Sequence, residues 1–339
     1  MSKKPLVSIV TPCYNGASYI DRYFETIMGQ TYPHIELIFV DDGSTDDTLA
    51  RAEAWRERLE ERGISFKLLT HPNGGQASAI NLGLPEVNGK YVTWPDSDDL
   101  MDPRNIELKA EYLEEHPEKG LVVCDVAHVY EDDLNTVVHE SVFDDSSSRL
   151  FDGLIREKKG SFCSDIAYLA RAEALFSALG GRHIYESPSG QNWQLLFPLT
   201  YNYDCGFIHQ ALATYVMRRN SHSRSYITLD ERMRRTYELE DIIRHVLPAV
   251  GMNDSDFRAY QEYANVKYLP LRFSFAVEMG DKEAARKIKG ELDAAQGPTR
   301  KRGLTMLLCD IGLGHACYAC SRGARRALQG VRAVLKRGR

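Results

Sequence analysis

Short apolar segments rich in β-branched residues alternate with helical segments over the first 100 residues, and this alternation constrains the fold more than any other feature. Strands are predicted at residues 6–11, 35–40, 66–69 and 91–94. Helices are predicted to begin at Ser18 and to span residues 45–62 and 76–84. Such alternation is typical of an α/β fold with a mostly parallel, doubly wound sheet. Ligands of such sheets bind beyond the carboxyl ends of the strands.

Polar residues directly follow three of the predicted strands, at residues 14–16 (Tyr-Asn-Gly), 41–44 (Asp-Asp-Gly-Ser) and 96–99 (Asp-Ser-Asp-Asp). In this topology the three segments are expected to converge at one edge of the sheet. Asp, Asn and Gly also form ordinary turns, which is the alternative for any single segment. Three carboxylate-rich segments at one edge instead indicate a bound cation.

Asp96 and Asp98 are the first candidates for that cation site. Two carboxylates separated by one residue can share a hard cation, and Mg²⁺ or Mn²⁺ is often held by one or two carboxylates plus phosphate oxygens and water. A cation held in this way suits a diphosphate leaving group, whose developing charge it neutralises. The alternative is that Asp98 or Asp99 caps the following helix.

The second half of the chain contains fewer strand signals. A helix is predicted at residues 107–115, a strand at 121–130, a loop with a short helix at 144–159 and a strand at 208–217. Residues 229–295 have a helical pattern.

The charge is distributed unevenly. The chain carries 42 basic and 48 acidic residues, for a net charge of −6. Residues 299–339 contain ten basic residues and one acidic residue, a charge of +9, which leaves −15 on the first 298 residues. A body this acidic is not expected to bind nucleic acid, because phosphate would be repelled.

The basic tail has an amphipathic segment at residues 324–335, with apolar residues on one helical face and basic residues on the remainder. This pattern is typical of a helix that lies on an anionic membrane surface. The alternative is a helix docked on the acidic body. Residues 303–321 contain too many polar and glycine residues for a transmembrane helix.

The seven cysteines are scattered and odd in number, which favours reduced thiols inside the cell over a disulfide scaffold. Cys309, Cys317 and Cys320 do not have the spacing of a zinc site, so we expect no metal there. Residues 1–10 lack the long apolar stretch of a signal peptide. We therefore expect a cytoplasmic protein, peripheral on the inner face of the cell membrane.

Four segments together resemble family 2 glycosyltransferases of the GT-A fold: residues 7–16 (VSIVTPCYNG), 40–48 (VDDGSTDDT), 73–81 (which begins Asn-Gly-Gly) and 94–99 (WPDSDD). The resemblance is strong over residues 5–105 and weaker to residue 225. It implies a GT-A-type α/β fold with a nucleotide-sugar-binding half (1–105) and an acceptor-binding half (106–225). A helical extension (226–298) and the basic tail (299–339) would follow.

The resemblance also implies inverting transfer of a hexose or N-acetylhexosamine from a UDP-sugar to a cell-surface glycan precursor, with Mn²⁺ or Mg²⁺ as cofactor. Matched position by position, the resemblance implies a set of residues that bind the nucleotide sugar. They would pack on the base, bind the uracil, ribose or sugar, or support that site, and they are Pro12, Tyr14, Asp42, Asn73, Asp96 and Asp99. The residues implied to hold the metal are Asp98 and His222.

Gln191 and Asn192 depart from the family pattern, and Trp193 has an open role. The catalytic base of the family is an Asp, whereas this chain has Gln191 and Asn192 there, and neither amide accepts a proton at neutral pH. Glu186 is the expected substitute, and Asp165 is the second candidate. Trp193 is expected to stack on a sugar, or alternatively to belong to the core.

The remaining departure is Ile80, which stands where many relatives have an arginine that contacts the diphosphate. Together with the amides at the base position, it motivates an alternative function, a nucleotide-sugar-binding protein without turnover. A nucleotidyltransferase would need a basic glycine-rich loop, and residues 12–16 contain no lysine or arginine.

Overall fold

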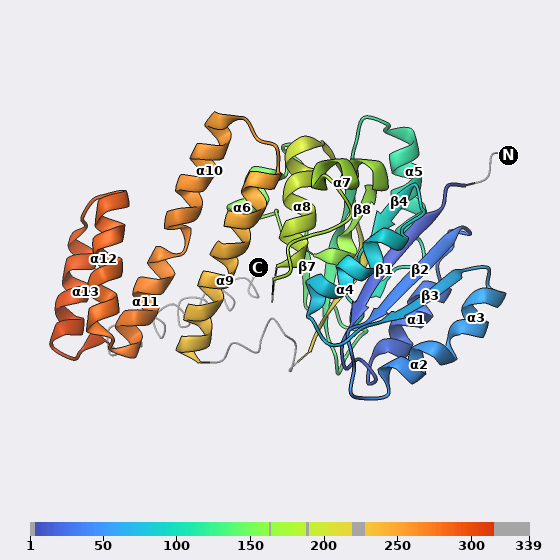
Figure 1. The fold of residues 1–339 in the computed structure, drawn as a ribbon, viewed down its shortest axis with the longest axis horizontal. Helices are drawn as coiled ribbons and strands as arrows, with labels where there is room; N and C mark the ends of the chain where they lie inside the picture. The colour runs from blue at the N-terminus through green and yellow to red at the C-terminus, as the bar shows by residue number, and fades with distance from the viewer. Residues whose placement is uncertain (1–3, 163, 188–189, 219–227, 315–339) are drawn as a thin grey trace, which may run out of the picture. The chain divides into compact units, whose positions relative to one another are not determined.

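The computed structural model describes residues 4–162, 164–187, 190–218 and 228–314. The chain divides into two compact units, one formed by Met1–Ser221 with Ile242–Phe257 and the other by His222–Asp241 with Arg258–Arg339. The first unit is an α/β structure and the second is helical (Figure 1).

The α/β unit is built on a nine-stranded sheet with the order β3-β2-β1-β4-β8-β6-β9-β5, and β7 pairs with β6. Pairs among β1, β2, β3 and β4 are parallel, as is the pair of β6 and β9, whereas β8 is antiparallel to both of its neighbours. The strands are β1 (Val7–Cys13), β2 (Ile35–Asp41), β3 (Ser65–Thr70), β4 (Tyr91–Thr93), β5 (Leu100–Met101), β6 (Leu121–Tyr130), β7 (His139–Ser141), β8 (Tyr168–Arg171) and β9 (Cys205–Met217).

Helices flank this sheet and cover its apolar side chains. The structure therefore confirms the predicted α/β fold. The helices of this part of the chain are α1 (Ile20–Met28), α2 (Thr48–Ala54), α3 (Arg56–Glu61), α4 (Gln76–Gly83), α5 (Asn105–Glu115), α6 (Phe151–Ile155), α7 (Ala172–Leu179) and α8 (Gln191–Asn202), with short 3-10 turns η1 (Leu84–Glu86) and η2 (Asp165–Ala167).

The core beside β2 is aromatic. Phe24, on the buried face of α1, lies with its ring centroid 5.1 Å from that of Phe39 and 5.5 Å from that of Trp55. The helix predicted over residues 45–62 is divided into α2 and α3 at Trp55. At this break the Trp55 backbone N–H bonds to the Ala52 carbonyl three residues back, and the buried ring donates its indole N–H to Asp21 over 2.8 Å.

A short antiparallel pairing places the 96–99 segment beside the end of β9. Leu100 and Met101 of β5 pair with Thr214 and Ala213 of β9. Because antiparallel partners run in opposite directions, the residues that precede Leu100 lie alongside those that follow Thr214. This register brings the carboxylates of residues 96–99 close to residues 216–218.

The helical unit has its own apolar core, formed by α11 (Leu269–Met279), α12 (Lys282–Gln296) and α13 (Arg300–Asp310). The unit boundaries fall within α9 (Leu229–Ala249) and α10 (Asp254–Lys267). Local signals set the helix limits: Asp281 and Thr299 cap α12 and α13 through backbone N–H groups, and Gly280 ends α11 in the left-handed region. None of the described helices is both long and apolar enough to cross a membrane.

Candidate active site

The segments that follow β1 and β2 are joined by hydrogen bonds at one edge of the sheet. Cys13 and Asp41 are register partners at the ends of these parallel strands. Beyond them, the Asn15 backbone N–H donates to Ser44 Oγ over 2.9 Å, and the Thr45 N–H donates to Asn15 Oδ1 over 2.8 Å. The first two sequence motifs therefore form one continuous surface.

Asp42 joins the third motif to this surface. Its buried carboxylate accepts the backbone N–H groups of Gly74 at 2.8 Å and Gly75 at 3.0 Å. The next residue, Gln76, donates its side-chain amide to Asp96 of the fourth motif. Two successive residues thus connect Asp42 to Asp96. The segments 14–16, 41–44 and 96–99 meet at the carboxyl ends of the strands, as predicted, and the third motif joins them there.

Three carboxylates gather in the fourth motif. Asp96, Asp98 and Asp99 each place an oxygen within 4.8 Å of the others. Asp99 is buried and accepts the Val216 backbone N–H over 2.9 Å, whereas Asp96 and Asp98 are partly exposed. Oxygen donors at this spacing suit a hard divalent cation such as Mg²⁺ or Mn²⁺. The donor set therefore fits the metal that the sequence predicts.

Arg218 lies against this carboxylate cluster. Its Nε and Nη2 atoms lie 2.8 and 2.7 Å from Oδ2 of Asp98. The guanidinium carbon also lies 4.2 Å from the centroid of the Tyr19 ring, which is buried. Burial alone would lower the pKa of Arg218, but Asp98, Tyr19 and Glu131 together outweigh this effect and the pKa is raised.

Burial and mutual repulsion raise the pKa values of part of the cluster. Burial raises the pKa of Asp96 to about 7, and the neighbouring Asp98 charge contributes to the shift. Burial also raises the pKa of Asp99 well above its ordinary value, with further contributions from Asp98 and Asp96. A cation bound here would offset the repulsion that produces these shifts.

Asp165 joins the cluster from a different element, η2. Its buried side chain lies beside Asp96 and Asn192, and burial, together with the neighbouring Asp96 charge, raises the pKa of Asp165 well above its ordinary value. Oδ1 of Asp165 and Oδ1 of Asn192 are buried and have no hydrogen-bond partner among the described residues. The amide at the family's base position therefore contacts a carboxyl group that the chain supplies from elsewhere.

Glu186, the expected substitute base, is exposed in the segment between α7 and α8. This segment is fastened to α4 through Asn81, whose amide donates to the Ile184 carbonyl and accepts its N–H, each over 2.8 Å. Asn81, which ends the third motif, therefore positions the chain two residues before Glu186. Among the residues that the structure describes, no hydrogen bond or ion pair connects Glu186 to the carboxylate cluster.

The other predicted site residues differ in their exposure to solvent. Pro12 is buried at the end of β1, and Tyr14 and Asn73 are exposed. Trp193 is partly buried on α8, where its ring stacks on Phe197 with centroids 5.4 Å apart. The predicted metal ligand His222 lies outside the described residues.

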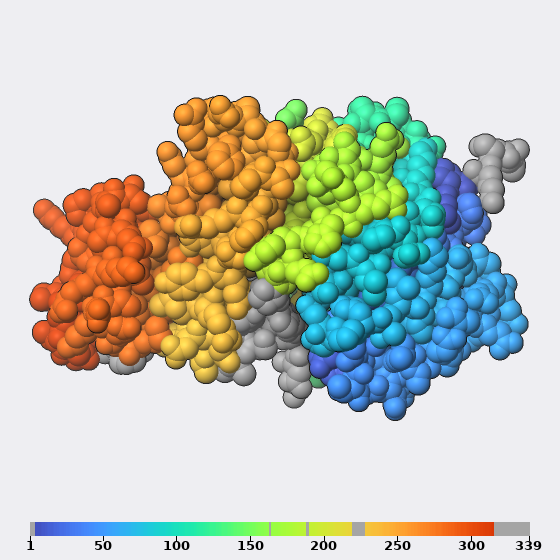
Figure 2. Space-filling view, viewed as in Figure 1, coloured from blue at the N-terminus to red at the C-terminus, as the bar shows by residue number. Residues whose placement is uncertain are grey.

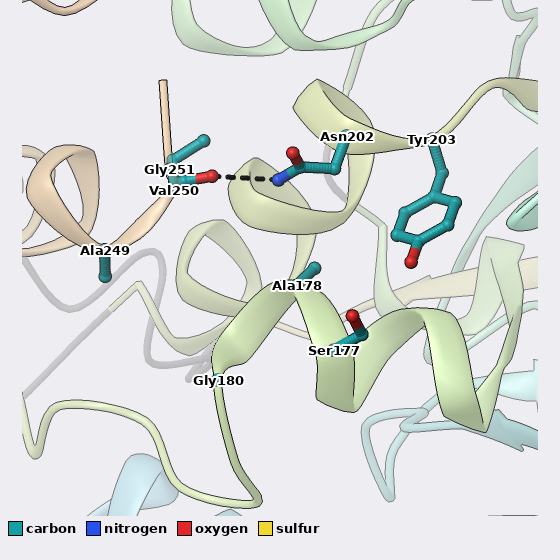
Figure 3. Close-up of a pocket in the computed structure, with 8 residues that line it drawn as sticks. All are labelled: Ser177, Ala178, Gly180, Asn202, Tyr203, Ala249, Val250 and Gly251. Atoms are coloured by element: carbon teal, nitrogen blue, oxygen red, sulfur yellow. Dashed lines mark hydrogen bonds between the residues drawn. The ribbon is translucent and has the colours of Figure 1, made fainter. Parts of the chain in front are cut away.

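A separate cavity of about 420 Å³ lies in the α/β unit, at the ends of α7 and α8. Figure 3 shows Asn202 reaching toward Val250 at one side of it, and the amide donates to the Val250 carbonyl over 2.9 Å. Its lining contains no charged side chain and none of the motif residues. The lining residues are Ser177, Ala178, Gly180, Asn202, Tyr203, Ala249, Val250 and Gly251.

Sequence reasoning did not assign roles to Gln76 or to the contacts of Asn81 and Val216. The signal for Gln76 was its position directly after the Asn-Gly-Gly turn. The contacts of Asn81 and Val216 each join segments more than 100 residues apart, so no local pattern reports them.

Residues 8–175 match the model of the family described as Glycosyl transferase family 2. Through these residues the chain belongs to glycosyltransferase family 2. An uncharacterized glycosyltransferase of Rickettsia prowazekii is 37% identical over 119 residues, which are 35% of this chain and 35% of that protein. The hyaluronan synthase of Pasteurella multocida is 37% identical over 108 residues, 32% of this chain and 11% of that protein. The family 2 chain thus spans about a third or less of the length of these relatives.

Solved structures share the fold over nearly the whole family 2 chain. S. aureus TarS 1-349 in complex with UDP-GlcNAc has a TM-score of 0.64 at 18% identity and covers 94% of this chain and 92% of its own. The mannosyltransferase PcManGT from Pyrobaculum calidifontis, in complex with GDP-Man and Mn²⁺, has a TM-score of 0.53 at 18% identity and covers 96% and 87%. The predicted GT-A-type fold is therefore confirmed.

Proposed function

We propose that this protein is an inverting glycosyltransferase that moves a hexose or N-acetylhexosamine from a UDP-sugar to a cell-surface glycan precursor. The observation that carries the proposal is the convergence of four motifs on the Asp96, Asp98 and Asp99 carboxylates. The nucleotide sugars bound by TarS and PcManGT, and the hyaluronan synthase among the relatives, support this donor and acceptor class.

Each motif has a role in this proposal. Tyr14 is exposed beside the buried Pro12 and is available to pack on the base, with Asp42 and Asn73 next to it on the uridine side. Asp96 faces the ribose or sugar, and Asp99 holds the segment to β9. Asp98 would hold Mn²⁺ or Mg²⁺, together with His222. When bound, the ion would neutralise charge that develops on the diphosphate.

The proposed reaction is a single displacement. The acceptor hydroxyl gives its proton to a carboxylate as its oxygen bonds to C1, and the bond from C1 to the diphosphate oxygen breaks with its electron pair leaving on the nucleotide. We assign the proton to Glu186, which is exposed toward solvent and held in place through Ile184. Asp165 is the alternative, because it contacts the amide at the family's base position.

Glu186→Gln is expected to lower kcat about a hundredfold and to leave the affinity for UDP unchanged, because general base catalysis contributes on this scale. Steady-state UDP release with a glycan acceptor measures kcat, and titration calorimetry measures the affinity. Glu173→Gln, on α7, is the control. An unchanged kcat in Glu186→Gln with a large loss in Asp165→Asn would move the base to Asp165.

The donor site is tested directly by titration calorimetry of UDP into the full chain, with Mn²⁺ and with EDTA. We expect binding in Mn²⁺ that weakens at least about tenfold in EDTA, because a carboxylate cluster repels a diphosphate unless a cation lies between them. Absence of UDP binding under both conditions would remove the proposal.

A nucleotide-sugar-binding protein without turnover is the second candidate, favoured by Asn192 in place of the carboxylate base. This candidate predicts metal-dependent UDP binding together with no transfer to any acceptor and no hydrolysis of a UDP-sugar. Screening donors by UDP release separates the two candidates.

We also propose that the basic tail attaches the protein to an anionic membrane surface on the cytoplasmic side. The amphipathic segment 324–335 lies outside the described residues, but α13 supports the proposal. Its buried Met306 and Cys309 face α11 and α12, whereas Leu304, Leu307 and Ile311 are 57 to 61% exposed. The surface of α13 is drawn in red in Figure 2. Exposed apolar residues beside basic ones are typical of interfacial helices.

Replacing Leu304, Leu307 and Ile311 together by serine is expected to reduce flotation of the full chain with phosphatidylglycerol vesicles, and neutral vesicles should bind little of either protein. The expected loss is several-fold, since buried apolar area and charge both contribute to binding. Serine in place of the exposed Leu271 of α11 is the control. Unchanged flotation would show that α13 does not contact the lipid.

A further inference from the structure

Arg218 occupies the carboxylate to which we assign the metal, Asp98. Both Nε and Nη2 of Arg218 point at Oδ2 of Asp98, at 2.8 and 2.7 Å. A divalent ion bound to that carboxylate would lie about 2 Å from an oxygen, and two cations at one carboxylate repel each other. The ion pair in the structure is therefore one of two possible states of Asp98.

The surroundings of Arg218 allow it a second position. The residue directly follows the last residue of β9, so the strand fixes its backbone while the side chain extends beyond the sheet edge. The guanidinium carbon lies 4.2 Å from the centroid of the Tyr19 ring. The guanidinium can therefore turn away from Asp98 and still stack on this ring. Side-chain exposure of about one fifth at both Arg218 and Asp98 leaves their contact open to an incoming ligand.

A diphosphate is the partner that would accept Arg218 when it leaves Asp98. The two N–H donors of a guanidinium can each bond a separate oxygen of a phosphate group. On Asp98, by contrast, both donors of Arg218 share the single oxygen Oδ2. Ile80 of the third motif is buried in the core and offers no charge to a diphosphate.

We propose that Arg218 and a divalent cation exchange on Asp98: the guanidinium holds this carboxylate before donor binding, and it moves to the diphosphate oxygens when metal and nucleotide bind together. The inference rests on the proposed function and adds a step to it. Arg218 then excludes metal from the nucleotide-free site and strengthens binding of the metal–nucleotide complex, so that metal and donor bind cooperatively.

The test uses the full chain and two variants, Arg218→Gln and Arg218→Lys. Binding of Mn²⁺ alone is measured from the electron paramagnetic resonance signal of free Mn²⁺, and binding of UDP at saturating Mn²⁺ is measured by calorimetry. Arg156→Gln is the matched control, because Arg156 Nε lies 2.6 Å from a carboxylate oxygen of Asp152 in a pair on the surface. Circular dichroism confirms that each variant is folded.

Arg218→Gln is expected to bind Mn²⁺ alone about tenfold more tightly than the native chain and to bind UDP in Mn²⁺ about tenfold more weakly, the scale of one charge-assisted hydrogen bond. Both affinities of Arg218→Lys should lie between those of the native chain and Arg218→Gln. Both affinities of Arg156→Gln should match those of the native chain. Unchanged or weaker Mn²⁺ binding in Arg218→Gln would overturn the exchange, because the residue would then only stabilise the strand end.

Three further outcomes separate the inference from the proposed function. If the native chain binds UDP in Mn²⁺ and Arg218→Gln behaves identically, the exchange fails and the proposed function stands. If the native chain binds UDP equally well in EDTA and Arg218→Gln abolishes that binding, Arg218 is a permanent substitute for the metal and the exchange is wrong. If the native chain binds no UDP, both fail.

Discussion

Replacing Asp98 by asparagine is expected to lower the rate of sugar transfer roughly a thousandfold, the largest catalytic effect among the variants considered. The amide keeps the size of the side chain but removes the charge that holds a divalent ion. Charge stabilisation of this kind contributes several kcal/mol to a transition state, and each 1.4 kcal/mol is about tenfold in rate. UDP release under saturating donor and Mn²⁺ measures the effect.

Asp152→Asn is the control for this variant, because Asp152 carries an exposed ion pair with Arg156 on α6. UDP affinity in EDTA should be no weaker in Asp98→Asn than in the native chain, since the loss depends on the ion and the amide removes a charge that repels the diphosphate. A kcat within a factor of three of the native value in Asp98→Asn would show that Asp98 does not hold a catalytic ion.

Replacing Arg272 by alanine is expected to destabilise the helical unit by about 3–5 kcal/mol, the largest effect on stability. Arg272 of α11 is 5% exposed, and its Nη1 lies 2.5 Å from Oε2 of Glu240, which is 9% exposed. The same guanidinium donates to Thr236 Oγ1 and to the Thr236 carbonyl, each over 2.8 Å. Removing one partner leaves a buried carboxylate without its counter-charge, and that penalty sets the magnitude.

Amide hydrogen exchange of α9 and α11 measures the loss, because it reports the stability of these helices independently of the α/β unit. Arg234→Ala removes an ion pair with Glu238 of α9 in which the arginine is 67% exposed, and it should cost less than about 1 kcal/mol. The double variant Arg272→Met with Glu240→Leu should recover most of the stability, since apolar residues of similar volume often replace a buried pair at no cost. A loss below 1 kcal/mol in Arg272→Ala would contradict this account.

The candidate site was predicted in its outline but not in its contacts. The alternation of strands and helices placed Asp42, Asp96 and Asp98 at one sheet edge, and the structure joins Asp42 to Asp96 there through Gly75 and Gln76. The predicted role of Glu186 came from its distance along the chain to Asn192, which carries no information on packing. In the structure Asn192 contacts Asp165 instead.

Two structural details could not be predicted from the sequence. The helix predicted over residues 45–62 is interrupted at Trp55, whose backbone N–H bonds to the Ala52 carbonyl three residues back and whose indole N–H pairs with Asp21 of another helix. Asn81 was identified as part of a motif, but its contact with Ile184 joins residues 103 positions apart. Both effects depend on a partner that local periodicity does not specify.

The amino-acid sequence by itself determined the α/β class, the family and the edge of the sheet at which the site forms. These follow from periodicity and from short motifs, which act over neighbouring residues. Tertiary structure alone decided that Arg218 lies on Asp98 and that Asp165 reaches Asn192. The first contact results from the antiparallel register of β5 on β9, and the second from the packing of η2 beside α8. Long-range register and packing are set by the whole core, so no single segment encodes them.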